Sequence, residues 1–158
     1  MKLASGIAPI PQMLSQGLTV GLGTDGCASN NNLDLFSEMD TAAKLHKVNT
    51  FDPTVMDARS VLKMATIHGA RVLGLQDVTG SLEVGKKADV IVIDTHKPHL
   101  TPMYNATSHL VYAARGNDVS HSIINGQPVM EDRNLLTLDI TEIMARAREM
   151  SIRVRSWL

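Results

Sequence analysis

An aspartate follows a short apolar run near the amino terminus of this chain. The run Leu18–Leu22 ends in Gly23-Thr24-Asp25-Gly26. A carboxylate in such a position has two ordinary uses. It can hydrogen-bond to its own backbone in a turn, where Asp and Gly are common, or a strand can deliver it to a site where it binds a metal ion or handles a proton. The residue types around Asp25 by themselves favour the turn-capping role over the metal- or proton-binding role. The predicted secondary structure around Asp25 is therefore needed to choose between these two roles.

The other metal-ligating side chains do not form a recognisable site. No two histidines stand as His-x-His or His-x-x-x-His, and His96 and His99 are separated by Pro98 in an expected loop. A catalytic zinc site needs roughly three protein ligands. We therefore expect little or no metal binding by this chain alone. The six histidines are His46, His68, His96, His99, His109 and His121.

Three further polar residues have a structural and a functional interpretation. Cys27 has no histidine near it in the sequence, so we interpret it as a small buried thiol rather than a nucleophile. His68 shares a helical stripe with Ala65 and Val72, which is typical of a packed, hydrogen-bonded core histidine. The run 30–32 of three asparagines can cap a helix or contact a substrate, and capping is favoured.

The first 75 residues carry helical patterns around one strand-like segment. Residues 7–17 predict a short helix that ends at Gly17, and residues 18–24 predict a buried strand with Asp25 just past its carboxyl end. A helix is expected to follow the asparagines, and a second helix is expected from Asp57 to Leu73. Gly74 and Leu75 then fit a Schellman-type cap.

From residue 76 the pattern changes from helical to alternating. Residues 80–94 suggest two short strands around a Gly-Lys-Lys turn, and residues 108–114 and 119–124 suggest two more. Asn125-Gly126 is a strong signal for a two-residue hairpin, with residues 127–131 as the returning strand. Asp139 is placed to cap a terminal helix. We therefore divide the chain into residues 1–75, a β-rich portion 76–138, and a carboxyl-terminal helix 139–158.

Composition limits the classes of function. The chain has 158 residues with 44% hydrophobic and 20% charged residues, which is typical of a globular protein. Its net charge of -1 gives no basic footprint for nucleic acid and no polybasic membrane signal. The sequence shows no membrane span and no signal peptide. The single cysteine excludes an internal disulfide, so a cytoplasmic setting is expected.

The isolated strand is difficult to explain within this chain. One strand flanked by helices cannot satisfy both of its backbone edges, and a βα pattern normally repeats until a sheet is complete. We therefore expect the chain to be the carboxyl part of a larger α/β protein. Exposed sheet edges would also favour self-association.

Four stretches in a fixed order carry a family resemblance. They are Gly23-Thr24-Asp25-Gly26, Ser29-Asn30-Asn31, the helix end from His68 to Leu75, and the run from Gly80 to Asp94. Together they resemble the carboxyl-terminal part of a metal-dependent amidohydrolase. Within that superfamily the chain is most similar to methylthioadenosine/S-adenosylhomocysteine deaminases and N-ethylammeline chlorohydrolase-like proteins. The stretch from Lys2 to Pro9 supports this placement.

The resemblance implies an α/β fold, namely the last units of a (β/α)8 barrel with part of a small β-sandwich domain. It matches Asp25 to the family's metal-ligand aspartate, which also handles a proton of the attacking water. A divalent metal, with zinc expected and iron or manganese as alternatives, would lower the pKa of that water to about 7. The implied reaction is deamination or dechlorination of a nitrogen heterocycle. The remaining ligands and the glutamate proton shuttle have no match in this chain, so we expect the chain alone to be inactive.

Two other interpretations stay open. The chain could be a non-catalytic subunit or pseudoenzyme module that acts through assembly with another chain. It could also belong to another amidohydrolase branch, such as the guanine deaminases or imidazolonepropionases.

Overall fold

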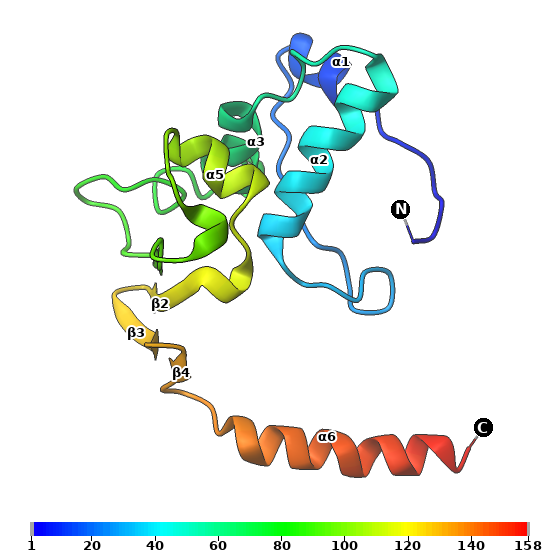
Figure 1. Cartoon of the computed structure of the whole chain (residues 1–158), viewed down its shortest axis with the longest axis vertical. Helices are drawn as coiled ribbons and strands as arrows, with labels where there is room; N and C mark the ends of the chain where they lie inside the picture. Colours follow the sequence, from blue (N-terminus) through cyan, green and yellow to red (C-terminus); the bar gives the residue numbers. More distant parts are fainter. Residues whose placement is uncertain (1, 158) are drawn as a thin grey trace.

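The computed structural model describes residues 2–157 as a helical layer, a small antiparallel sheet and a separate carboxyl-terminal helix (Figure 1). The helices of the first half are α1 (Ile10–Ser15), α2 (Leu35–Thr50), α3 (Ala58–Ala65) and α4 (Ile67–Val72). The second half holds β1 (Val90–Ile93), η1 (Pro98–Leu100), α5 (Ala106–Tyr112), η2 (Gly116–Asp118), β2 (Val119–Ile124), β3 (Gln127–Glu131), β4 (Asn134–Leu135) and α6 (Ile140–Arg155). None of the helices in the described residues is long and apolar enough to cross a membrane.

Aspartate and asparagine side chains begin the main helices. Asp34 accepts a hydrogen bond from the Phe36 N–H at 2.9 Å, and Asp57 accepts from the Arg59 N–H at 2.9 Å. Such caps satisfy backbone donors that lack partners in the first turn of a helix. The predicted start of α2 at the asparagines was therefore wrong by a few residues, because Asp34 is the residue whose side chain reaches the free N–H.

The helix predicted from Asp57 to Leu73 is interrupted at Thr66. Thr66 has φ -128° and ψ -104°, and its hydroxyl donates to the Leu62 carbonyl at 2.7 Å. The predicted cap is confirmed at the far end. The Leu75 N–H donates to the Ala70 carbonyl at 2.8 Å and the Gly74 N–H donates to the Arg71 carbonyl at 3.1 Å, with Gly74 at φ 70°. These two bonds make up a Schellman motif.

The sheet is antiparallel throughout, in the order β1-β2-β3-β4. The predicted two-residue hairpin at Asn125-Gly126 joins β2 to β3, and the φ values of 51° and 78° at these residues fit a type I′ turn. Two strand predictions were wrong. Residues 80–85 are loop, and residues 108–114 contain α5, because the Asn105 side chain caps a helix there by accepting from the Ser108 N–H at 2.9 Å.

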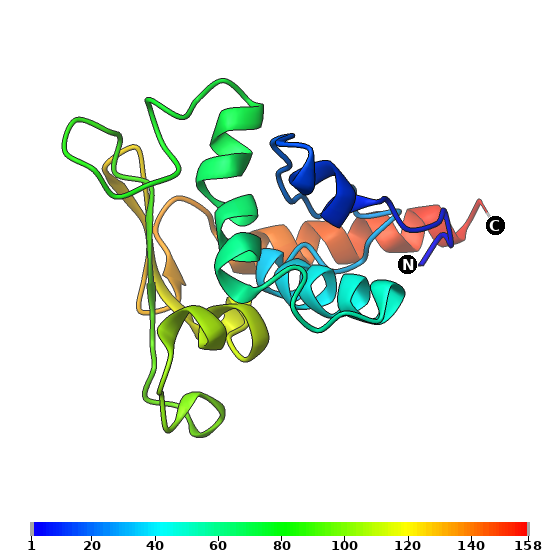
Figure 2. The same ribbon diagram turned by 90° about the horizontal axis from the view of Figure 1, so that it is seen from above.

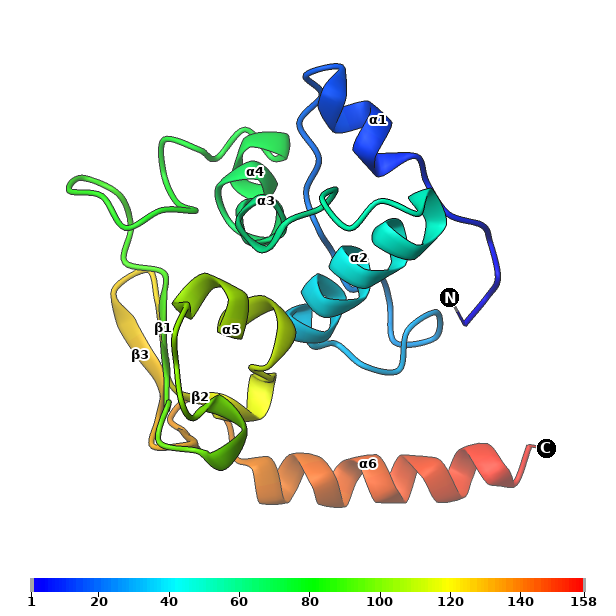
Figure 3. The ribbon, with the colours of Figure 1, turned by 45° about the horizontal axis from the view of Figure 1, so that its top comes forward.

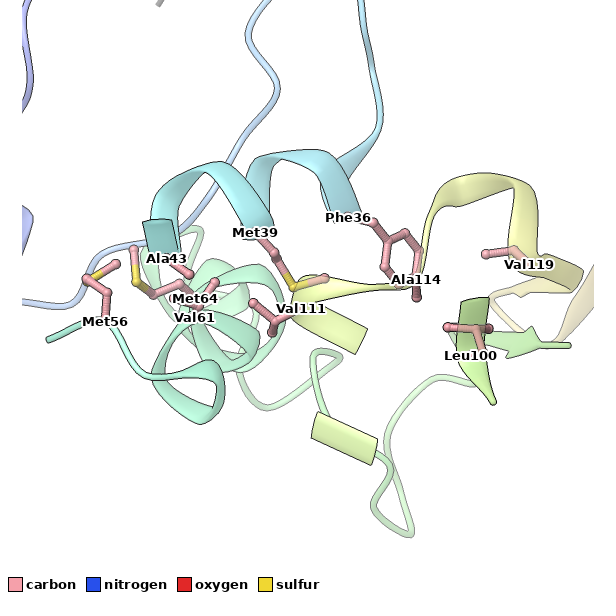
Figure 4. Packing of buried hydrophobic residues seen from close by; sticks show 10 residues of the cluster. All are labelled: Phe36, Met39, Ala43, Met56, Val61, Met64, Leu100, Val111, Ala114 and Val119. Atoms are coloured by element: carbon pink, nitrogen blue, oxygen red, sulfur yellow. The ribbon is translucent and has the colours of Figure 1, made fainter. Parts of the chain in front are cut away.

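The core joins helices from both halves of the sequence. Val61 and Met64 of α3 pack with Met39 of α2 and Val111 of α5, as Figure 4 shows. Leu100 and Val119 extend this cluster toward the sheet. Methionine and small aliphatic side chains fill this core, as the sequence predicts from its few aromatic residues. The domain division at residue 75 stays a prediction.

Residues 18–23 form no strand in the described part of the chain, so the strand predicted there is not seen. The segment runs as coil past α3 and α4, between α1 and the loop that leads to α2 (Figure 3). A strand needs a hydrogen-bonded neighbour, and the only sheet in residues 2–157 starts at Val90. The segment is nevertheless held in place, in the way described below.

Candidate functional site

Asp25 lies at an exposed tip after this coil segment, with φ 59°. The Gly26 N–H donates to Asp25 Oδ1 at 2.7 Å, a local bond of the kind that makes the left-handed region tolerable for Asp. Its other carboxylate oxygen makes no hydrogen bond within residues 2–157. Asp25 is therefore an exposed loop residue with one carboxylate oxygen that makes no hydrogen bond within residues 2–157.

The coil that leads to Asp25 is fixed to the α3–α4 junction. The Leu22 N–H donates to the Met64 carbonyl at 3.0 Å, and Met64 lies in the last turn of α3, where carbonyls lack helical partners. A Cβ on Gly21 would lie 3.0 Å from the Gly69 Cα, so these two backbones approach as closely as glycine allows. Backbone contacts with the α3–α4 junction therefore hold the coil segment that leads to Asp25 in place.

The loop after Asp25 is held by Asn30. The Asn30 N–H donates to the Gly26 carbonyl at 2.8 Å, while Asn30 Nδ2 donates to the Thr24 carbonyl at 3.0 Å and to Glu38 Oε1 at 2.6 Å. Asn30 Oδ1 accepts from the Asn32 N–H at 3.1 Å. Capping was the prediction for Asn30, and it was wrong, because Asp34 caps α2. The half-buried Asn30 side chain instead bonds to Thr24, Glu38 and Asn32.

Several other aspartates are occupied by structural roles. Asp34 caps α2 and also accepts from the Gly116 N–H at 3.0 Å, which ties α2 to η2. Asp57 caps α3, and Asp139 caps α6 by accepting from the Glu142 N–H at 3.0 Å. These contacts distinguish them from Asp25, whose carboxylate binds only the adjacent residue.

Asp118 is the most strongly perturbed of these carboxylates. It is 3% exposed, with Oδ1 2.9 Å from Lys97 Nζ and Oδ2 3.0 Å from His99 Nε2. Burial alone would raise the pKa of Asp118. Hydrogen bonds from His99, Lys97 and the Arg115 N–H, with the charge of Lys97, outweigh that effect and hold its pKa at about 2. Asp118 is therefore ionised and paired, in a structural role that the sequence pattern did not reveal.

The histidines and the cysteine make no site with Asp25. His46 is buried on α2 and His68 is half-buried on α4, and burial lowers the pKa of both. Within residues 2–157 the His68 Nδ1 atom is buried without a hydrogen-bond partner. The predicted packing of His68 is therefore partly present, and the predicted hydrogen bond is not seen at this atom. Cys27 is exposed, so the prediction of a buried thiol was wrong, because its loop projects from the body of the fold.

A separate apolar cavity of about 910 Å³ lies beside the coil segment and does not include Asp25. Its walls come from residues 21–23, from α4, from the loop around Gly80 and from Ile91 of β1. Gly80, with φ 90°, is required at this wall because a Cβ there would lie 2.7 Å from the Ala70 Cβ. The cavity is lined mainly by apolar residues. Its polar lining residues include Thr79 and Asp89, and the Thr79 hydroxyl donates to Asp89 Oδ2 at 2.8 Å.

Residues 1–129 match the amidohydrolase family. The chain belongs to that family. Over 148 residues this amidohydrolase chain is 64% identical to a 5-methylthioadenosine/S-adenosylhomocysteine deaminase of Syntrophobacter fumaroxidans, a match that covers 94% of this chain and 34% of the relative. It is 58% identical to a 5′-deoxyadenosine deaminase of Methanosarcina barkeri, again over 94% of this chain and 34% of the relative. The chain thus spans about a third of the length of these curated relatives.

Solved structures of other hydrolases are also similar to this chain. An adenosine deaminase of Xanthomonas campestris with bound zinc is 42% identical with a TM-score of 0.95, over 98% of this chain and 35% of that one. An atrazine chlorohydrolase of Arthrobacter aurescens, complexed with zinc, is 30% identical with a TM-score of 0.83, over 91% of this chain and 32% of that one. These neighbours support a partial α/β structure of the amidohydrolase type.

The described residues of this amidohydrolase chain hold no complete metal site. No three His, Cys, Asp or Glu side chains lie together in a metal-binding group within residues 2–157. A catalytic zinc ion takes roughly three protein ligands.

Proposed function

We propose that this segment contributes Asp25 to the metal centre of an aminohydrolase that removes the amino group from adenine nucleosides. Methylthioadenosine, S-adenosylhomocysteine and 5′-deoxyadenosine are the proposed substrates, because relatives at 64% and 58% identity are named for deaminating them. The observation that carries the role of Asp25 is its exposed carboxylate, of which one oxygen accepts from the Gly26 N–H and the other makes no hydrogen bond within residues 2–157.

Deamination is favoured over dechlorination by the degree of similarity. The chlorohydrolase neighbour is 30% identical, well below the deaminases. Zinc is the proposed metal, since both structural neighbours are described with it, and iron or manganese remain alternatives. The single unpaired cysteine favours a cytoplasmic setting for the protein.

An assembly role is the second candidate function. The open apolar cavity and the exposed apolar side chains of α6 favour association with further polypeptide. Assembly and catalysis are compatible, because the missing metal ligands would arrive with that polypeptide.

A chimeric enzyme tests the role of Asp25. This chain replaces the matching third of the Syntrophobacter fumaroxidans deaminase, and loss of the adenine chromophore of methylthioadenosine is followed in the ultraviolet. The chimera is expected to be active. Asp25→Asn should lower its turnover at least about a hundredfold, because even outer-shell partners of a metal cost ten- to a hundredfold. Zinc content should fall in parallel.

Asp77→Asn is the matched control, because Asp77 is also an exposed loop aspartate and its side chain accepts from the adjacent Gln76 at 3.2 Å. It should leave turnover within about twofold. An Asp25→Asn chimera with full turnover and full zinc content would refute the proposed ligand role. Deamination by the 158-residue chain on its own would contradict the proposal that further ligands are needed.

A further inference from the structure

Asn30 hydrogen-bonds to the residues that precede and follow Asp25 in the sequence. Its main-chain N–H donates to the carbonyl of Gly26, the residue after Asp25, at 2.8 Å. Its side-chain amide donates to the carbonyl of Thr24, the residue before Asp25, at 3.0 Å. Asn30 thus bonds to the carbonyl of each neighbour of the proposed ligand. The Thr24 carbonyl lies in the peptide group directly before Asp25, whereas the Gly26 carbonyl lies in the peptide group between Gly26 and Cys27.

The bond to Thr24 bears on the conformation of Asp25. The Thr24 carbonyl and the Asp25 N–H belong to one planar peptide group, so restraining that carbonyl restrains φ of Asp25. That angle is 59°, in the left-handed region that costs an L-residue energy and persists where surrounding contacts enforce it.

The second side-chain hydrogen of Asn30 anchors this arrangement to a helix. Asn30 Nδ2 donates to Glu38 Oε1 at 2.6 Å, and Glu38 lies in the first turn of α2. Phe36 and Met39, on either side of Glu38, belong to the buried core. The amide therefore connects an exposed loop to a rigid element.

We propose that Asn30 is a positioning residue, which sets the direction of the Asp25 carboxylate by bridging the Thr24 carbonyl to Glu38. The inference rests on the proposed function for its catalytic consequence, but its structural part stands on the 158-residue chain alone. An asparagine is suited to this position because it offers two donors and one acceptor, and all three are used here.

The first experiment measures amide hydrogen exchange in the 158-residue chain. Asn30→Ala should speed exchange at the amides of Gly26 and Asn30 on the order of tenfold, because the loop loses its tether. The matched control is Asn32→Ala, since Asn32 is an exposed residue of the same loop and its side chain makes no hydrogen bond in the described residues. It should leave both amides unchanged. Equal exchange in wild type and Asn30→Ala would overturn the inference, whatever the role of Asp25.

The second experiment uses the chimera described above and separates positioning from substrate contact. Asn30→Ala should lower kcat about ten- to a hundredfold with KM nearly unchanged, as expected for an outer-shell partner of a ligand. A rise in KM with constant kcat would instead identify Asn30 as a substrate contact and overturn the inference.

A double variant tests which of the two side-chain bonds matters. Asn30→Asp combined with Glu38→Gln exchanges the amide and the carboxylate, so the link to α2 can reform while the Thr24 carbonyl loses its donor. Turnover should stay low in this variant. Full recovery would show that the link to α2 suffices, and would contradict the proposed bridge to Thr24. If Asp25→Asn is fully active while Asn30→Ala still loosens the loop, the proposed function fails and the structural part of the inference survives.

Discussion

Two aspartates illustrate how similar side chains acquire different roles. Asp118 is buried and receives hydrogen bonds from Lys97, His99 and the Arg115 N–H. Both of its carboxylate oxygens are therefore paired with groups inside the fold. Asp25 is exposed, and within residues 2–157 its carboxylate accepts only from the Gly26 N–H. Burial and partners, rather than residue type, decide which carboxylate can bind a ligand.

The low pKa of Asp118 predicts a definite pH dependence of stability. Because the folded-state pKa of about 2 lies below the usual aspartate value of 3.8, the charge of Asp118 stabilises the fold above about pH 4. That contribution, roughly 2 kcal/mol at 1.36 kcal/mol per pKa unit, is lost as the pH falls from about 4 to 2. Asp118→Asn should lower the free energy of unfolding at pH 7, measured by urea denaturation.

The difference between wild type and Asp118→Asn should shrink as the pH falls through this window. Asp77→Asn, on an exposed loop, should change the free energy of unfolding by less than about 0.5 kcal/mol at any pH. A constant difference between wild type and Asp118→Asn from pH 7 to pH 2 would show that the ionised pair contributes no stability.

Among the helices in residues 2–157, α6 is the one that is exposed along its whole length. All of its residues are exposed, and Figure 2 shows the helix extending away from the sheet. Its apolar side chains nevertheless recur at helical spacing on one face, as Ile140, Ile143, Ala147, Met150 and Val154. The amphipathic pattern of α6 therefore predicts its helical state but does not identify what covers its apolar face.

Two methionine substitutions test this difference in packing. Met150 of α6 is 57% exposed and Met64 of α3 is 1% exposed. Met150→Lys should change the free energy of unfolding by less than about 0.5 kcal/mol, whereas Met64→Ala should cost about 2–5 kcal/mol. Urea denaturation of the 158-residue chain measures both. A loss of more than about 1 kcal/mol in Met150→Lys would mean that α6 folds back onto the body in solution.

At the scale of the whole molecule, apolar surface is left uncovered beside an open sheet edge. β1 lies at the edge of the sheet, and its residue Ile91 is half-exposed and lines the apolar cavity. Edge strands with exposed apolar residues favour pairing with other chains.

We therefore predict that the 158-residue chain self-associates with rising concentration. Light scattering after size exclusion should show the mean mass increasing, and Ile91→Lys should reduce the increase because a charged edge strand resists pairing. The control Val48→Lys places the same charge on an exposed position of α2, away from the sheet, and should have little effect. A single monomeric mass at all concentrations would exclude this association.

The sequence by itself determined the features that depend on near neighbours along the chain. The Schellman cap at Gly74, the Asn125-Gly126 hairpin and the Asp139 cap are local hydrogen-bond patterns, and each is present in the structure. The family was also readable, because the motifs around Asp25 and from Gly80 to Asp94 occur in a fixed order. That Asp25 is a metal ligand stays a prediction.

Only the tertiary structure decided what depends on distant contacts. It assigned α5 to a segment whose pattern also fitted a strand, and it left residues 18–23 without a strand partner. It also placed the Asn30 amide between the Thr24 carbonyl and Glu38, and it buried Asp118 among Lys97 and His99. The physical reason is that hydrogen bonds across many residues require the chain to be folded, so no local pattern records them.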